Sequence, residues 1–275
     1  MTGEMCLGTS KAACFRSGKS PTAGLAPLLA ARRDPPLLKP LKTAILATKP
    51  AESGERRIKK TGSRAMYATR TELMVVPGKA RAWEAWWAKV SELGKAQQGF
   101  QAGTLLNSLS YPAKYVSLTL WESREAGRAF AKGEAFSAFF QATSVQELAT
   151  LGRPQEAYDV LTRVMGEGQS AYASLIDWAL DPRPENAASF ERTRKEIFDL
   201  RKQYMPGFVG NGLGRLLGHL YRYQVVQFYS AMDALRSAVA GSQIPQIQAF
   251  MEAHPNSEHA STPTSGEGYE VVRQM

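Results

Sequence analysis

The spacing of apolar residues becomes regular at Met66. Residues 67–76 alternate loosely between apolar and polar side chains, which is typical of a strand, and Pro77-Gly78 closes it with a turn. Residues 80–97 follow a helical period. The apolar stripe of this segment consists of Trp83, Trp86, Trp87, Val90 and Leu93. Gly99 follows in the position of a C-cap glycine, so the pattern predicts a strand and then a helix.

Two more strands, a helix and a last strand are predicted from the next 65 residues or so. Residues 103–110 and 114–121 predict a hairpin, because apolar and polar residues alternate in its second strand. Residues 124–141 predict a helix, and residues 158–164 predict a strand. The order β-α-β-β-α-β is that of a ferredoxin-like unit.

The same order of patterns returns in the rest of the chain. Its predicted elements are a strand at 171–180, a helix at 184–204, a glycine-rich hairpin running into 223–229, a helix at 232–240 and a strand at 269–274. The C-terminal segment therefore predicts a second unit of the same kind.

Direct alignment supports an internal duplication. A shift of 108 positions places residues 99–130 on residues 207–238 without a gap, with seven identities in 32 positions, where average composition gives about two by chance. The identical pairs are Gly99/Gly207, Phe100/Phe208, Leu105/Leu213, Leu109/Leu217, Tyr115/Tyr223, Ala126/Ala234 and Arg128/Arg236. Trp121 falls on Tyr229, so an aromatic residue is kept there.

Duplication predicts how the two units pack. One βαββαβ unit covers a single face of its sheet with helices, and two units packed sheet to sheet bury both open faces. The sequence therefore predicts an α+β fold of two tandem ferredoxin-like units that form an intramolecular dimeric α/β barrel. We place a basic leader at residues 1–65, the first unit at 66–166 and the second at 167–275, and expect the chain to be a monomer.

The charge distribution limits the possible partners. The net charge of the 275 residues is +9, but residues 1–65 hold 13 Lys/Arg against 4 Asp/Glu, whereas residues 66–275 hold 21 of each. The folded body is therefore electrically balanced, and we expect it to bind no nucleic acid. The leader is compatible with a disordered tail, an organellar transit segment or a start codon placed upstream of Met66.

No apolar run reaches the roughly 18 residues that a membrane-spanning helix needs, so we expect no membrane association and a cytoplasmic location. Both cysteines, Cys6 and Cys14, lie in the leader, which leaves the body without thiol chemistry, an iron–sulfur cluster or disulfides. His254 and His259 flank a polar loop, but no third ligand is visible nearby, so no metal site is expected.

Several motifs of the first unit resemble the antibiotic biosynthesis monooxygenase (ABM) domain. They are the opening strand–Pro77-Gly78-Lys79–helix, the pair Gly99-Phe100, the strand Tyr115-Val-Ser-Leu-Thr-Leu-Trp121-Glu-Ser123 and the Ala/Phe-rich helix after it. The resemblance covers about residues 66–164 and, more faintly, 171–275. It implies a dimeric α/β barrel that oxidises a small aromatic substrate of polyketide or quinol type with O₂, without metal, flavin or haem.

The resemblance and the aromatic pattern together suggest site residues. We assign Trp121, Tyr115 and Ser117 as catalytic candidates. The candidates for substrate binding are Asn107, Trp83, Trp87, Tyr223 and Tyr229. Aromatic oxygenases of the family carry Asn where this chain has Ser117 and a Tyr where it has Gly127, and the haem-degrading branch carries a His where it has Ala131.

Two readings of function follow from these residues. One is a cofactor-independent monooxygenase; the alternative is a non-catalytic barrel that binds a hydrophobic small molecule. Trp121 and Tyr115 favour the first, and the departures at Ser117 and Gly127 favour the second. The helical residues Trp83, Trp86 and Trp87 are more typical of core packing than of a ligand site.

Overall fold

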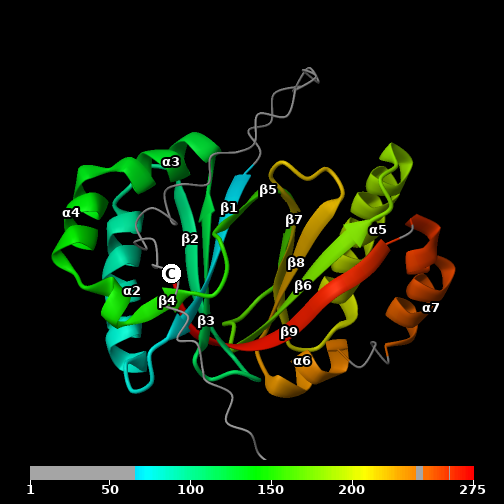
Figure 1. Ribbon diagram of the computed structural model, residues 1–275. Coiled ribbons are helices and arrows are strands. Elements are labelled where there is room, and N and C mark those ends of the chain that lie inside the picture. The colour runs from blue at the N-terminus through cyan, green and yellow to red at the C-terminus, as the bar shows by residue number, and fades with distance from the viewer. Residues whose placement is uncertain (1–65, 240–243, 260) are drawn as a thin grey trace, which may run out of the picture. The chain divides into compact units, whose positions relative to one another are not determined.

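The computed structural model describes residues 66–239, 244–259 and 261–275 (Figure 1). The expectations for the leader, including Cys6 and Cys14, lie outside these residues. No helix in the described part of the chain combines the length and apolar character needed to cross a bilayer.

The first unit, β1 to β5, has the predicted order of elements with two additions. Its elements are β1 (Met66–Val75), α2 (Ala80–Lys95), β2 (Phe100–Ser108), β3 (Lys114–Trp121), α3 (Arg124–Lys132), α4 (Glu134–Ala142), a 3₁₀ turn (Val145–Glu147), β4 (Ala149–Leu151) and β5 (Glu156–Met165). The single helix expected over 124–141 is divided at Gly133, whose backbone is extended (φ −61°, ψ 143°). The 3₁₀ turn and β4 were not expected from the sequence.

The second unit, β6 to β9, repeats this order. Its elements are β6 (Tyr172–Leu180), α5 (Pro184–Tyr204), β7 (Phe208–Leu216), β8 (Arg222–Tyr229), α6 (Met232–Val239), α7 (Pro245–Ala253), a 3₁₀ turn (Asn256–His259) and β9 (Ser261–Gln274). The last strand begins well before the expected residue 269, because its polar first half pairs with β6 from Leu175 to Leu180. Helix α7 was not expected.

The strands close into an antiparallel barrel. Within each unit the order is that of a ferredoxin-like fold, β5-β1-β3-β2 and β9-β6-β8-β7. Strand β5 then pairs with β7, and β9 pairs with β2, which joins the two sheets into one ring. The short β4 pairs with the end of β1 outside this ring. The prediction of an α+β barrel built from two tandem βαββαβ units is confirmed.

The turn before the second strand has the same geometry in both units. Gly99 and Gly207 have positive φ values of 85° and 74°, which favour glycine over any residue with a side chain. A Cβ at Gly99 would lie 2.7 Å from Ala126 Cβ, and one at Gly207 would lie 2.8 Å from Ala234 Cβ. The four residues belong to the identical pairs of the sequence alignment, so those identities correspond to equivalent close contacts.

An ion-pair network joins the two units through the face of β1 that points away from the helices. Arg70 Nη1 lies 3.0 and 3.1 Å from the two carboxylate oxygens of Asp177 on β6. Lys114 of β3 contacts Glu267 of β9 at 2.7 Å. Because both contacts cross from one unit to the other, they fix how the two sheets meet.

Candidate functional site

A cavity of about 1160 Å³ lies in the first unit between its helices and the outer face of its sheet. Strands β1, β2 and β3 form its floor, and α2, α3 and α4 form its walls. The turn between β7 and β8 of the second unit, residues 216–219 and 222, completes its edge. The cavity is therefore an enclosure of the first unit with one contribution from the second, and its volume suits a small organic molecule.

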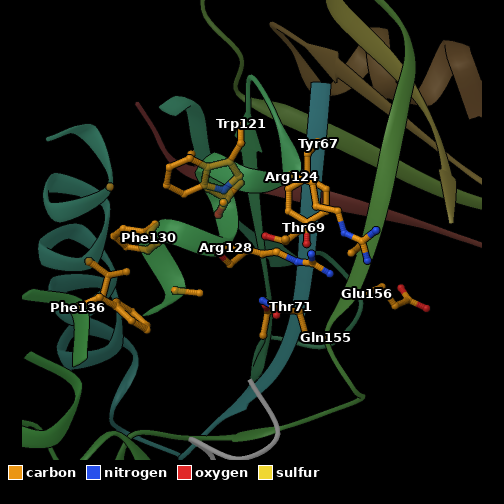
Figure 2. A pocket seen from close by; sticks show the side chains of 18 of the residues that line it. Tyr67, Thr69, Thr71, Trp121, Arg124, Arg128, Phe130, Phe136, Gln155 and Glu156 are labelled. Carbon is orange, nitrogen blue, oxygen red and sulfur yellow. The ribbon is translucent and has the colours of Figure 1, made fainter. Parts of the chain in front are cut away.

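Aromatic side chains form the walls in a connected series. Trp83 and Trp86 stack with ring centroids 5.0 Å apart. Through Phe140, which contacts both Trp86 and Phe136, the series continues to Phe130, 4.9 Å from Phe136, and to Trp121, 5.2 Å from Phe130. Figure 2 shows Trp121, Phe130 and Phe136 following one another along one side of the cavity. Such a surface suits a flat aromatic ligand, which gains by burial and by ring stacking.

Small hydroxyl side chains form the floor. They are Thr69 and Thr71 on β1 and Ser117 and Thr119 on β3. Ser117 Oγ accepts a hydrogen bond of 2.8 Å from Trp87 Nε1, and Thr71 Oγ1 accepts one of 3.0 Å from Gln155 Nε2. These two acceptors keep their own hydroxyl protons available, so the floor can donate to an oxygen of a bound molecule.

Three residue differences show why the layer between helices and sheet is open in the first unit and packed in the second. The strand registers place Thr71 beside Ser117 in the first unit and Ile176 beside Val225 in the second.

The third difference is at Gly127, which aligns with Leu235, a side chain only 4% exposed in the second core. A Cβ at Gly127 would lie 2.9 Å from the Tyr67 ring and 3.2 Å from the Trp121 ring. The missing side chain thus lets both rings reach the cavity.

Tyr67 lies at the rim close to two arginines, Arg124 and Arg128 (Figure 2). Burial raises the pKa of its phenol above the ordinary value, and this effect outweighs the lowering by the two guanidinium groups. The phenol is therefore protonated at neutral pH. It makes no hydrogen bond to any described residue, so it remains free to donate to a ligand.

Four of the eight residues assigned from sequence lie in the cavity lining. They are the catalytic candidates Trp121 and Ser117 and the binding candidates Trp83 and Trp87. The indole N–H of Trp121 has no hydrogen-bond partner among the described residues and is available to a ligand. Ser117 of the floor instead accepts a hydrogen bond from Trp87 of the wall, which holds these two side chains together.

The other catalytic candidate, Tyr115, lies outside the lining and ties a helix to the sheet. Its hydroxyl donates to Glu84 of α2 at 2.9 Å. Tyr223 donates to Glu191 of α5 at 2.8 Å in the same way. Because the contact recurs in the unit whose core is packed, we attribute it to folding.

Asn107 and Tyr229 also lie outside the cavity lining. The side chain of Asn107 donates to the carbonyls of Pro112 and Lys114, which shapes the hairpin turn. Tyr229 is fully buried in the second core, where its hydroxyl donates to Gln227.

Sequence reasoning missed Tyr67, Arg124 and Gly127 as parts of the site. Arg124, Arg128 and Lys132 recur every four residues, which places them on one helix face and is a readable signal. The role of Gly127 has no local signal, because it depends on Tyr67, a residue sixty positions earlier in the chain.

Of the two histidines considered for a metal site, His254 contacts a carboxylate, whereas both ring nitrogens of His259 are buried without a partner among the described residues. His254 Nδ1 lies 3.1 Å from Glu258 Oε2, and His259 is fully buried beside the ring of Phe190. Among residues 66–239, 244–259 and 261–275, no three His, Cys, Asp or Glu side chains are grouped as metal ligands.

Comparison with solved structures shows the same fold in other proteins. A candidate monooxygenase from Fusobacterium nucleatum is 13% identical with a TM-score of 0.59, over 78% of this chain and 95% of its own. A candidate monooxygenase from Lactobacillus acidophilus is 14% identical with a TM-score of 0.56, over 76% and 94%. An anthrone oxidase-like protein is 14% identical with a TM-score of 0.50, over 78% and 93%. At these identities the likeness is one of fold.

Comparison with protein families places the first unit. No curated protein matches the sequence. The family model described as antibiotic biosynthesis monooxygenase matches residues 66–142, the segment that supplies most of the walls and floor of the cavity. Within the first unit, residues 66–142 are thus similar to the antibiotic biosynthesis monooxygenase family.

Proposed function

We propose that the cavity of the first unit is the active site of a cofactor-independent monooxygenase that oxidises a small aromatic molecule with O₂. One observation carries this proposal. The segment that matches a monooxygenase family encloses an aromatic-walled cavity with a hydroxyl floor. The corresponding positions of the second unit hold Ile176, Val225 and Leu235 in a packed layer. We therefore assign the second unit the role of supporting the barrel.

The substrate itself supplies the electrons in this reaction. An anthrone or a related phenol loses a proton to give a stabilised carbanion, which reduces O₂ and forms a carbon–oxygen bond. Loss of water from the resulting hydroperoxide leaves a carbonyl. One oxygen atom of O₂ ends in the product and the other in water, which takes both hydrogens from the oxidised carbon.

The protein contributes enclosure and hydrogen-bond donors. Negative charge develops on the substrate oxygen as the carbanion forms, and donors aimed at that oxygen lower the barrier. The indole N–H of Trp121, the hydroxyl of Ser117 and the phenol of Tyr67 are among the donors that line the cavity. The aromatic walls hold the ring system and keep water from the reacting carbon.

One observation favours the alternative, a barrel that binds a hydrophobic molecule without transforming it. Among the described residues of the lining the one carboxylate is Glu156, which already accepts a hydrogen bond of 2.7 Å from Tyr158. The floor therefore offers hydroxyl groups but no free carboxylate as a base. In the oxygenase, the imidazole of His219, which lines the cavity from the turn between β7 and β8, is the side chain placed to accept the substrate's proton.

Oxygen consumption tests the proposal with a matched pair of tryptophan variants. We expect the wild-type chain to accelerate O₂ uptake by an anthrone. Trp121→Phe should lower this rate about tenfold or more, because it removes a donor to the developing oxyanion. Trp178→Phe, the same change in the second unit, should leave the rate unchanged, because Trp178 lies in the packed core.

Two outcomes of this assay would contradict the oxygenase proposal. One is a wild-type rate no higher than the uncatalysed background, which favours the binding barrel. The other is an equal loss of rate in both variants, which would point to general destabilisation.

We also infer that the two units arose by duplication, divided near residues 166 and 167, and that the chain works as a monomer. The equivalent close contacts at Gly99 and Gly207 support the first inference. The pairing of β5 with β7 and of β9 with β2 supports the second, because it satisfies sheet edges that a lone unit would leave open. The cytoplasmic location stays a prediction.

A further inference from the structure

Positive charge gathers at the rim of the cavity. Arg124, Arg128 and Lys132 follow one another at four-residue intervals along α3, and Arg222 reaches the same cavity from β8. The single carboxylate of the lining, Glu156, lies 3.6 Å from the buried guanidinium of Arg70. The rim therefore carries a clear excess of cations over anions.

Folding does not account for Arg124 and Arg128. Neither arginine forms an ion pair or a hydrogen bond with any described residue, and the Nε of Arg124 is buried without a partner. Arg124 is the first residue of α3, where the helix dipole disfavours a cation. Arg128 is exposed, but the buried Nε of Arg124 without an acceptor costs stability, so Arg124 points to an acceptor supplied by a ligand.

The two guanidinium groups are placed to bind one anionic group. Figure 2 shows Arg124 and Arg128 on the side of the cavity away from Phe130 and Phe136, close to Tyr67. An arginine matches the planar geometry of a carboxylate, and two arginines with a phenol can surround one. A ligand held there would extend its ring system toward Trp121.

We propose that the aromatic ligand of this cavity carries a carboxylate, which Arg124 and Arg128 bind at the rim while the rings lie between the aromatic walls. This inference rests on the proposed function for the cavity as the working site, but it concerns recognition and does not require that a reaction occurs. The carboxylate would fix which carbon of the ring system faces the hydroxyl floor.

Isothermal titration calorimetry with two probes tests this inference on the full chain. The probes are anthraquinone-2-carboxylate and anthraquinone-2-carboxamide, which share one ring system and differ in charge. We expect wild type to bind the carboxylate at least about tenfold more tightly than the carboxamide. The preference should shrink as salt concentration rises, because the rim is open to solvent.

The double variant Arg124→Gln/Arg128→Gln should lose this preference and keep the wild-type affinity for the carboxamide. Arg192→Gln, a change at an exposed arginine of α5, should bind both probes as wild type does. If the arginines had only a structural role, the double variant would lose affinity for both probes, so unchanged carboxamide affinity distinguishes the two cases.

Three results would overturn the inference. They are equal wild-type affinity for the two probes, an equal loss for both in the double variant, and no binding of either probe. Failure of the oxygenase proposal is a separate result. A chain that prefers the carboxylate probe yet consumes no O₂ with an anthrone supports the anion site and refutes the oxygenase.

Discussion

Gly127→Leu is expected to weaken binding of anthraquinone-2-carboxylate by about a hundredfold, which corresponds to about 3 kcal/mol of overpacking. A Cβ at this position would already lie 2.9 Å from the Tyr67 ring and 3.2 Å from Trp121. A leucine would therefore displace both rings into the cavity. The second unit has Leu235 at the aligned position in its packed core, so a leucine there is compatible with the fold.

Ala129→Leu is the matched control for Gly127→Leu, because Ala129 lies on the same helix and is exposed. It should change neither affinity nor thermal unfolding. Calorimetry measures the affinities, and circular dichroism verifies that both variants are folded. Wild-type affinity in a folded Gly127→Leu variant would show that ligands bind somewhere other than this cavity.

Asp177→Ala is expected to lower the free energy of unfolding by about 2–4 kcal/mol. Asp177 is the main partner of Arg70, whose side chain is 3% exposed and belongs to the other unit. Without Asp177, Arg70 keeps only weaker contacts with Glu72 and Glu156, at 3.5 and 3.6 Å. Urea denaturation measures the change. Loss of this pair weakens the junction of the two units.

The contribution of Asp177 should also depend on pH. Burial alone would raise its pKa, but Arg70 and hydrogen bonds from Ser265 and Gln224 hold the pKa below the ordinary value. The stabilisation is therefore complete above the ordinary pKa, near 4, and is lost as the pH falls through the lower folded-state value.

Two measurements complete the test of Asp177. In Asp177→Ala, the acid-induced loss of stability below about pH 4 should be smaller than in wild type. Asp199→Ala breaks an exposed ion pair with Lys195 of 2.8 Å and should leave stability nearly unchanged. Equal effects of the two substitutions would mean that the link between the units does not depend on Arg70 and Asp177.

Much of the fold follows from local pattern. The helix expected at residues 184–204 has these bounds in the structure, and the strand expected at 114–121 likewise. The division at Gly133 was missed because the Ala- and Phe-rich segment around it keeps high helix propensity on both sides. The polar first half of β9 was missed because pairing with β6, which lies far away in the chain, makes it a strand.

The candidate site was predicted in part. Trp121 and Ser117 have the same parity on β3, so they point to the same face of the sheet. Trp83 and Trp87 share one face of α2. Periodicity therefore placed all four side chains on the side where the cavity lies. Tyr115 has the same strand parity, but it lies beyond the cavity, where Glu84 holds it. Periodicity identifies a face of an element; it does not show where along that face a cavity ends.

The openness of the first unit could not be predicted from either unit alone. It arises from pairs that meet only in the folded chain, Thr71 with Ser117 and Gly127 with Tyr67. The duplicated sequence does contain the comparison, since Ser117 aligns with Val225 and Gly127 with Leu235. Small residues aligned with large apolar ones mark the unit that keeps space for a ligand.

A crystal structure of the full chain with anthraquinone-2-carboxylate tests the central claim most directly. The account predicts one ligand in the first unit, with its rings between Trp121 and the α2 tryptophans and its carboxylate at Arg124 and Arg128. A ligand inside the barrel, or within the packed layer of the second unit near Tyr229, would contradict it.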